Sequence, residues 1–130
     1  METYTSRDNF CHLMTTHREP LPSVLETVGE TPLVRVQASP DAVPVYAKLE
    51  SFNPGASIKD RIGKHMLERM LERGDVDPGG TIIEPTAGNT GIGIAVAAGR
   101  LDLDAVFVVP ERFSVEKQQL MRALGAEVIN

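Results

Sequence analysis

Between residues 81 and 129, short apolar runs alternate with longer stretches of helical periodicity, and this alternation constrains the fold more than any other feature. Short runs rich in β-branched residues are typical of buried strands, whereas apolar residues that repeat with helical spacing are typical of helices. The predicted order is strand 81–84, helix 89–99, strand 105–109, helix 114–124 and strand 126–129. Strand–helix–strand units join by right-handed crossovers, which makes their strands parallel. The predicted fold class is therefore α/β, with a mostly parallel sheet and flanking helices.

The same alternation begins earlier in the chain. Residues 33–36 and 45–49 are predicted strands. Residues 58–73 are a predicted helix. Its apolar face has a stripe at every fourth position, formed by Ile58, Ile62, Met66 and Met70, with Leu67 and Leu71 beside them. Gly74 is placed to end this helix, and Ser114 is placed to cap the helix before residue 124. Residues 1–22 are polar and aperiodic and are predicted to be a disordered arm, with Met14 as a second plausible start, ahead of a domain over residues 23–130.

Composition excludes several classes of function. The chain has 13 basic and 18 acidic residues and a net charge of −5, which is a poor electrostatic match to nucleic acid. Cys11 is the only cysteine, so an intrachain disulfide and a CxxC metal site are excluded, and the three histidines lack metal-ligand spacing. No apolar stretch approaches the ~20 residues of a membrane span. We therefore expect a cytoplasmic protein without a bound metal.

Lys59 stands out because it follows a predicted turn and opens a predicted helix. The turn is Asn53-Pro54-Gly55, and only four lysines occur in the chain against nine arginines. The positive end of a helix dipole disfavours the ammonium form of a lysine and so favours the neutral amine that imine formation with an aldehyde needs. The alternative is that Lys59 is a solvated lysine in the first turn of a helix.

A second segment, residues 84–93, runs from a predicted strand through a turn rich in glycine, threonine and asparagine into a helix. The backbone N–H groups at such a helix start can bind an anion. The expected ligand is a carboxylate or a phosphate group. Thr86, Asn89 and Thr90 can add side-chain hydrogen bonds. The alternative is that this helix has small residues because it packs closely on the sheet. Close packing explains in part why glycine stands at position 93 and why alanines follow it.

These segments resemble a known family. Residues 53–62, Asn-Pro-Gly-Ala-Ser-Ile-Lys-Asp-Arg-Ile, resemble the lysine motif of cysteine synthases (O-acetylserine sulfhydrylases) and cystathionine β-synthases, which are pyridoxal-phosphate (PLP) enzymes of fold type II, like the tryptophan synthase β chain. Residues 86–91, Thr-Ala-Gly-Asn-Thr-Gly, resemble the family's substrate-carboxylate loop, and residues 29–33, Gly-Glu-Thr-Pro-Leu, its N-terminal motif. The helix-containing segment 112–126 also resembles its counterpart. The resemblance covers about residues 23–130.

The resemblance implies a role for each matching residue. Lys59 would hold PLP covalently and later act as the acid–base group, and Asn89 would hydrogen-bond the PLP 3′-oxygen. The substrate α-carboxylate would be bound by Thr86, Ala87, Gly88, Asn89 and Thr90. The implied reaction is β-replacement on O-acetylserine, in which sulfide replaces the acetate to give cysteine. A homodimer and an association with serine acetyltransferase are implied as well.

Two departures from the family pattern keep alternatives open. The loop commonly carries serine where this chain has Ala87. The Ala87 form, together with the stretch 113–118, looks more like a branch that uses O-acetylserine with homocysteine, so cystathionine formation is the close alternative. The family's phosphate-gripping loop and the serine that contacts the pyridine nitrogen are expected downstream of Asn130. We therefore expect residues 23–130 to be the N-terminal part of such an enzyme and to be inactive alone. The alternative is that the chain acts only as an interaction module.

A nucleotide-binding reading fits less well. Gly91 and Gly93 after a strand match half of a dinucleotide fingerprint, but Val96 stands where the third glycine belongs. The acidic residue expected about 20 positions on has only Glu111 as a candidate. PLP is therefore the expected cofactor and an amino acid the expected substrate.

Overall fold

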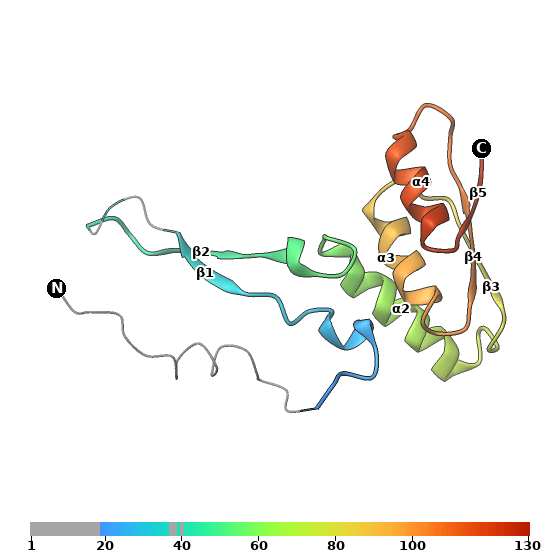
Figure 1. Cartoon of the computed structure of the whole chain (residues 1–130), viewed down its shortest axis with the longest axis horizontal. Helices are drawn as coiled ribbons and strands as arrows, with labels where there is room; N and C mark the ends of the chain where they lie inside the picture. The colour runs from blue at the N-terminus through green and yellow to red at the C-terminus, as the bar shows by residue number, and fades with distance from the viewer. Residues whose placement is uncertain (1–18, 37–38, 40) are drawn as a thin grey trace.

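The computed structural model describes residues 19–36, 39 and 41–130 (Figure 1). Most of the predicted arm over residues 1–22, including Met14 and Cys11, lies outside the described residues, and residues 19–22 are exposed. The elements are η1 (Val24–Thr27), β1 (Leu33–Val36), β2 (Val45–Lys48), η2 (Glu50–Phe52), α2 (Lys59–Arg73), β3 (Thr81–Glu84), α3 (Asn89–Ala98), β4 (Asp104–Val108), α4 (Val115–Ala123) and β5 (Glu127–Ile129). All predicted strands and helices are present, with bounds shifted by at most a single residue.

The three later strands form one parallel sheet in the order β3–β4–β5. Ile82 pairs with Ala105, and Phe107 pairs with Val128, so the apolar residues of neighbouring strands lie in register. Helix α3 packs on β4 and α4 on β5, while α2 packs against α3. The predicted α/β fold with a mostly parallel sheet is confirmed.

The first two strands do not join that sheet. β1 and β2 pair antiparallel with each other as a separate hairpin, in the register Leu33 opposite Lys48. Residues 37–44 connect them, which is shorter than the crossover of a dozen or more residues that parallel strands need. In Figure 1 the hairpin extends away from the helices and the larger sheet. The alternation that predicts a parallel sheet therefore applies only from β3 onward.

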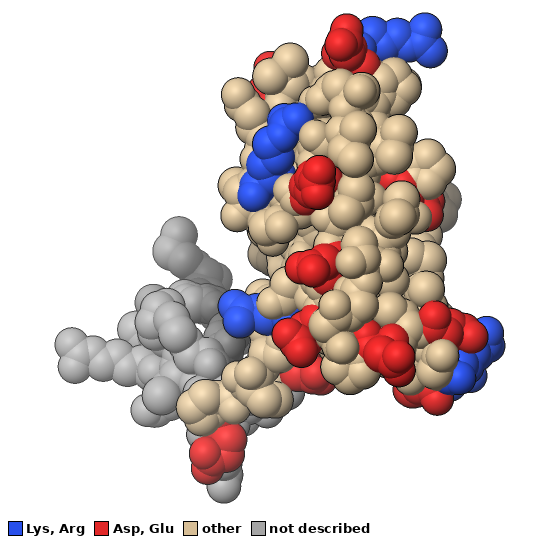
Figure 2. Space-filling view, turned by 90° about the vertical axis from the view of Figure 1, so that its right-hand side faces the viewer, with Lys and Arg blue, Asp and Glu red and all other residues tan. Residues whose placement is uncertain are grey.

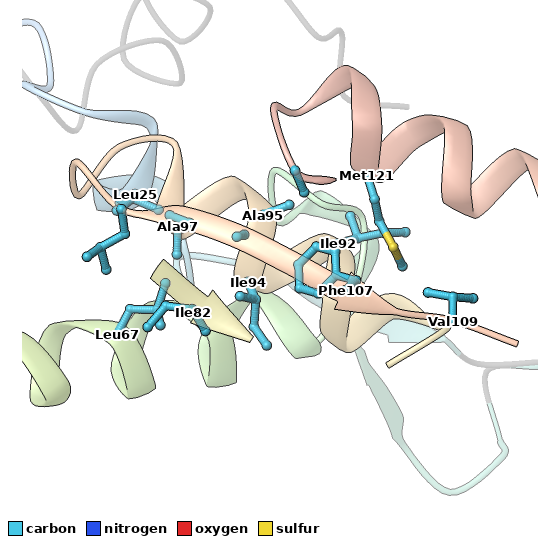
Figure 3. Close-up of a cluster of buried hydrophobic side chains, with 14 residues drawn as sticks. Leu25, Leu67, Ile82, Ile92, Ile94, Ala95, Ala97, Phe107, Val109 and Met121 are labelled. Carbon is cyan, nitrogen blue, oxygen red and sulfur yellow. The ribbon is translucent and has the colours of Figure 1, made fainter. Parts of the chain in front are cut away.

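The core lies between the parallel sheet and the helices on one of its faces. Figure 3 shows Leu67, Ile82, Ile94 and Phe107 gathered there. Met121 of α4 is fully buried in the same cluster. The opposite face of the sheet is exposed, with accessible apolar side chains at Ile83, Val108 and Ile129. Figure 2 looks onto that side, where uncharged surface predominates and acidic side chains gather toward the lower end.

The buried face of α2 matches the predicted apolar face only in part, because Leu67 is buried and Met66, Met70 and Leu71 pack against the core. Ile58 and Ile62 are exposed, whereas Asp60, Gly63 and Leu67 are buried. The reason lies in α3, whose small residues allow a close approach of backbones, so a glycine rather than a branched side chain faces it. The ends of α2 and α4 agree with prediction. Gly74 ends α2 with a φ of 72°, and the Ser114 hydroxyl accepts a hydrogen bond from a backbone N–H of α4.

Candidate active site

Lys59 is the first residue of α2, directly after a tight turn, as predicted. Ala56 in this turn has a φ of 59°, in the left-handed region that residues with a side chain rarely adopt. Its N–H donates to the carbonyl oxygen of Asn53 at 2.8 Å and closes the turn. The Lys59 N–H donates to Ser57 Oγ at 3.1 Å, which satisfies one of the donors that a helix start leaves open. The turn therefore determines where the lysine enters the helix.

The side-chain amine of Lys59 makes no hydrogen bond or ion pair with the described residues. Lys48 donates to the carbonyl oxygen of Thr31, and Lys64 donates to a backbone carbonyl of η1 at 2.9 Å. Among the described residues, by contrast, no hydrogen-bond or ion-pair partner contacts the amines of Lys59 and Lys117. Lys59 is half-buried. An amine in that state is available to a ligand without first breaking a contact within the protein.

The second predicted segment connects β3 to α3. Gly88 precedes the helix with extended backbone, and no side chain caps the helix start. Asn89 is the first helical residue and is exposed, while Thr86, Ala87, Gly88 and Thr90 are half-buried. The backbone donors that open α3 are thus free of side-chain caps, which suits them to bind an anion. Asn89 follows the cap position, which Gly88 occupies.

Helices α2 and α3 bring the two segments together, side by side in Figure 1. An ideal Cβ placed on Gly93 would stand 2.7 Å from the carbonyl oxygen of Lys59, and one placed on Gly63 would stand 2.4 Å from the Gly93 carbonyl group. Residues four apart share a helix face, so Asn89 lies one turn before Gly93 on the face toward α2. The starts of both helices therefore lie close together, as the sequence motifs require of a shared site.

A hollow of about 420 Å³ adjoins the loop after β3. Its lining comes from Pro85, Thr86, Ala87, Val108, Val109, Pro110, Phe113 and Asn130. It lies at the carboxyl ends of parallel strands, the place where ligands bind in open α/β sheets. Phe113 lies in a stretch that carries part of the family resemblance, but no role in a binding site was assigned to it from the sequence. Its only positional signal is that it lies four residues after the predicted strand 105–109.

A polar cluster supports the turn before Lys59. Arg61 binds Glu50 through two parallel contacts, Nε to Oε2 at 2.8 Å and Nη2 to Oε1 at 2.9 Å. The Arg61 guanidinium, with further hydrogen bonds from Thr31 and Asn53, lowers the pKa of Glu50 to about 2. The same pairing raises the pKa of Arg61. Sequence reasoning missed Glu50, since an acidic residue after a strand is common. Asn53 and Arg61 lie inside the lysine motif, where the sequence predicted Asn53 in a turn and Arg61 in a helix but no contact between them and Glu50.

Asp60 is a buried carboxyl group next to Lys59. Only 1% of it is exposed, its Oδ2 accepts a hydrogen bond from the Gly55 N–H, and its Oδ1 has no partner among the described residues. Burial raises the pKa of Asp60, against the lowering effect of the Gly55 N–H. A Cβ on Gly55 would stand 2.5 Å from Oδ1. Glycine at position 55 is therefore required by the carboxyl group packed against it.

The described residues contain no cluster of three or more histidine, cysteine, aspartate or glutamate side chains that could hold a metal ion. None of the described helices is long and apolar enough to cross a membrane. The groups present fit a ligand that carries an aldehyde and hydrogen-bonding oxygens. Lys59 offers a free amine, Asn89 offers an exposed carboxamide, and α3 offers uncapped backbone donors.

Residues 24–130 match the family model described as "Pyridoxal-phosphate dependent enzyme". The chain is 55% identical over 109 residues to the O-acetylserine dependent cystathionine beta-synthase of Bacillus subtilis (strain 168), an overlap of 82% of this chain and 36% of that protein. It is 49% identical over 109 residues to a cysteine synthase of Helicobacter pylori, an overlap of 81% of this chain and 36% of that protein.

A solved structure is similar over the same region. The O-acetylserine dependent cystathionine beta-synthase from Helicobacter pylori matches with a TM-score of 0.77 and 45% sequence identity, over 86% of this chain and 38% of that chain. The chain thus spans little more than a third of the length of the curated relatives it matches.

Proposed function

This chain belongs to the family of pyridoxal-phosphate dependent enzymes, and from that premise we propose that the protein performs a β-replacement on O-acetylserine with Lys59 as its PLP-binding residue. One observation carries the proposal. The unengaged amine of Lys59 opens α2 beside the uncapped start of α3, because Gly63 and Gly93 hold the two helices in backbone contact. The matched relatives named for cysteine and cystathionine synthesis support the same class of reaction.

Each segment has a distinct part in this proposal. Lys59 would hold PLP, and Asn89 would donate a hydrogen bond to the 3′-oxygen attached to the cofactor's pyridine ring. The free backbone donors at Gly88 and Asn89, with the hydroxyls of Thr86 and Thr90, would bind the substrate α-carboxylate. PLP, when bound, supplies an electron sink for negative charge at the substrate's α-carbon.

Lys59 has a second role as the proton carrier. Its Nζ would take the proton from the substrate's α-carbon and return one at the end of the reaction. Acetate leaves the β-carbon of O-acetylserine, and the sulfur of the incoming thiol forms its new bond at that carbon.

Sulfide is the first proposed acceptor, which makes cysteine the product. Homocysteine is the second, which makes cystathionine the product. Ala87 and the hollow beside it favour the second reading, because a lining rich in apolar side chains suits the carbon chain of a larger thiol. The relative at 55% identity is also named for cystathionine synthesis from O-acetylserine.

A competition experiment tests both parts of the proposal. The protein, as its source gene expresses it, is incubated with PLP, O-acetylserine and equal concentrations of sulfide and homocysteine, and both products are quantified. We expect one product to dominate and Lys59→Ala to abolish both, while Lys117→Ala leaves them unchanged. Persistent turnover in Lys59→Ala would contradict the assignment of the lysine.

Three further points stay predictions. They are a homodimer, an association with serine acetyltransferase, and a cytoplasmic location. The loop at Thr86–Thr90 is the proposed contact for the acetyltransferase's C-terminal tail. Binding of that peptide without turnover of O-acetylserine would favour an interaction module instead of an enzyme.

A further inference from the structure

We propose that Asn53 is a positioning residue for Lys59, which it serves by holding the backbone of Ser57 in the turn that leads into α2. The proposal rests on the proposed function, because it takes Lys59 as the reactive lysine. Asn53 does not contact Lys59 itself. It acts through the main chain of the turn between them.

The Asn53 side chain is buried, with 3% of the residue exposed, and it is saturated with hydrogen bonds. Its Nδ2 donates to the Ser57 carbonyl oxygen at 3.0 Å, to the Glu50 carbonyl oxygen at 3.0 Å and to Glu50 Oε2 at 2.9 Å. Its Oδ1 accepts from the Gly29 N–H at 2.8 Å. Two N–H hydrogens serve three acceptors, so one of them is shared. The Gly29 N–H also determines which way the carboxamide faces, because only oxygen can accept there.

Glu50 and Arg61 form an ion pair that fixes the position of the Asn53 carboxamide. The bidentate Arg61–Glu50 pair places one carboxylate oxygen on Asn53 Nδ2. Arg61 also donates to the Gly29 carbonyl oxygen at 3.0 Å, so both backbone groups of Gly29 are engaged by this cluster. Glu50 precedes the turn and Arg61 lies two residues after Lys59. The cluster therefore joins the chain on both sides of the lysine.

Ser57 connects Asn53 to Lys59 through two hydrogen bonds, one at its carbonyl oxygen and one at its hydroxyl group. Its carbonyl oxygen, held by Asn53, also accepts from the Asp60 N–H at 3.4 Å, and its hydroxyl accepts from the Lys59 N–H. Ala56, one residue earlier, has the left-handed φ of 59°, a conformation that persists only where the surroundings hold it. Without Asn53 the turn would be free to relax, and the first residues of α2 would move with it.

The test measures the position and the reactivity of Lys59 separately. Amide hydrogen exchange at Lys59 and Asp60 reports the two N–H groups that bond to Ser57. Labelling of Lys59 by PLP and borohydride, mapped by peptide, reports its amine, with Lys117 in the same chain as the internal reference. Because a displacement of about 1 Å can cost on the order of 100-fold in rate, we expect Asn53→Ala to lower the Lys59-to-Lys117 labelling ratio at least tenfold.

Gln118→Ala is the matched control. Gln118 is another buried carboxamide, 5% exposed, in α4, and it donates to the carbonyl oxygen of Phe113 just before that helix, far from the turn before α2 in sequence. We expect it to change neither the exchange at Lys59 nor the labelling ratio. All variants are compared at a temperature where circular dichroism shows them folded. If Asn53→Ala does not fold, Asn53→Ser replaces it, since the hydroxyl can reach only part of the same partners.

The outcomes separate this inference from the proposed function. Unchanged exchange at Lys59 and Asp60 in a folded Asn53 variant overturns the positioning role, whatever the labelling shows. Faster exchange with an unchanged labelling ratio also overturns it, because the turn would then loosen without affecting the amine. A wild-type protein whose Lys59 labels no better than Lys117 contradicts the proposed function instead, and the exchange data still decide whether Asn53 positions the helix start.

Discussion

Gly93 in α3 lies against the carbonyl group of Lys59 in α2, so closely that an ideal Cβ at position 93 would stand 2.7 Å from the Lys59 carbonyl oxygen. The atoms on the other side are main-chain atoms, which cannot swing away as a flexible side chain can. This contact sets the distance between the lysine and the loop that opens α3. It is the physical link between two motifs that stand 27 residues apart from Lys59 to Thr86.

Gly93→Ala is expected to force the two helices apart. The added methyl group gains about 1 kcal/mol in helix propensity, but overpacking typically costs about 1–3 kcal/mol, and here the obstacle is backbone. We expect a lower free energy of unfolding in urea and a weaker affinity for PLP. Gly99→Ala is the control on the same chain segment, because a Cβ there meets nothing nearer than 3.5 Å. Equal stabilities of the two variants would show that the contact does not constrain the helices.

Lys59 is expected to be the residue that PLP and borohydride modify. Lys48 and Lys64 are engaged by backbone carbonyl oxygens, which restricts their amines. Lys117 is the stringent comparison, since it also lies in the first turn of a helix and has a free amine among the described residues. The helix dipole alone therefore does not distinguish the two lysines, and only the neighbouring start of α3 does. Peptide mapping that placed the label mainly on Lys48, Lys64 or Lys117 would refute the assignment.

Asn89→Ala is expected to harm catalysis more than folding. The Asn89 side chain makes no capping hydrogen bond, so the roughly 1 kcal/mol that a cap contributes is not at stake. Thermal unfolding should change little, while turnover per bound PLP should fall by roughly tenfold or more, as for other lost oriented hydrogen bonds. Thr27→Ala, which removes a local hydroxyl contact in η1, serves as the control for a distant polar side chain. A variant that loses stability but keeps its turnover would point to a purely structural asparagine.

Glu50→Gln is expected to destabilise the protein at neutral pH. The pKa of Glu50 is about 2 in the folded chain against an ordinary 4.5, so the ionised carboxylate favours the folded state above pH 4.5. That contribution is lost as the pH falls from 4.5 toward 2, and the difference in melting temperature between wild type and variant should shrink over this window. Glu72→Gln is the control, because its pairing with Arg69 is exposed and such pairs contribute little. A difference that stays constant across the window would contradict the pairing.

The secondary structure and the identity of the two motif segments were determined by the sequence alone. Local patterns carry this information. The turn before Lys59, the end of α2 at Gly74 and the cap at Ser114 each depend on residues a few positions apart, and each is present in the structure. The family resemblance rested on the same local segments and is confirmed by the match over residues 24–130.

The tertiary structure decided which faces meet. The predicted apolar face of α2 included Ile58 and Ile62, which are exposed, whereas Gly63 is buried, because α3 approaches closest where neither helix has a side chain. The pairing of β1 with β2, apart from the parallel sheet, was also decided by the tertiary structure. The apolar pattern of a strand does not say which strand it pairs with, because pairing depends on the connections between strands. The cluster of Glu50, Asn53 and Arg61 also appeared only in three dimensions. A hydrogen-bond network that reaches from Gly29 to Arg61 has no local periodicity, and its energy exists only once the chain has brought its members together.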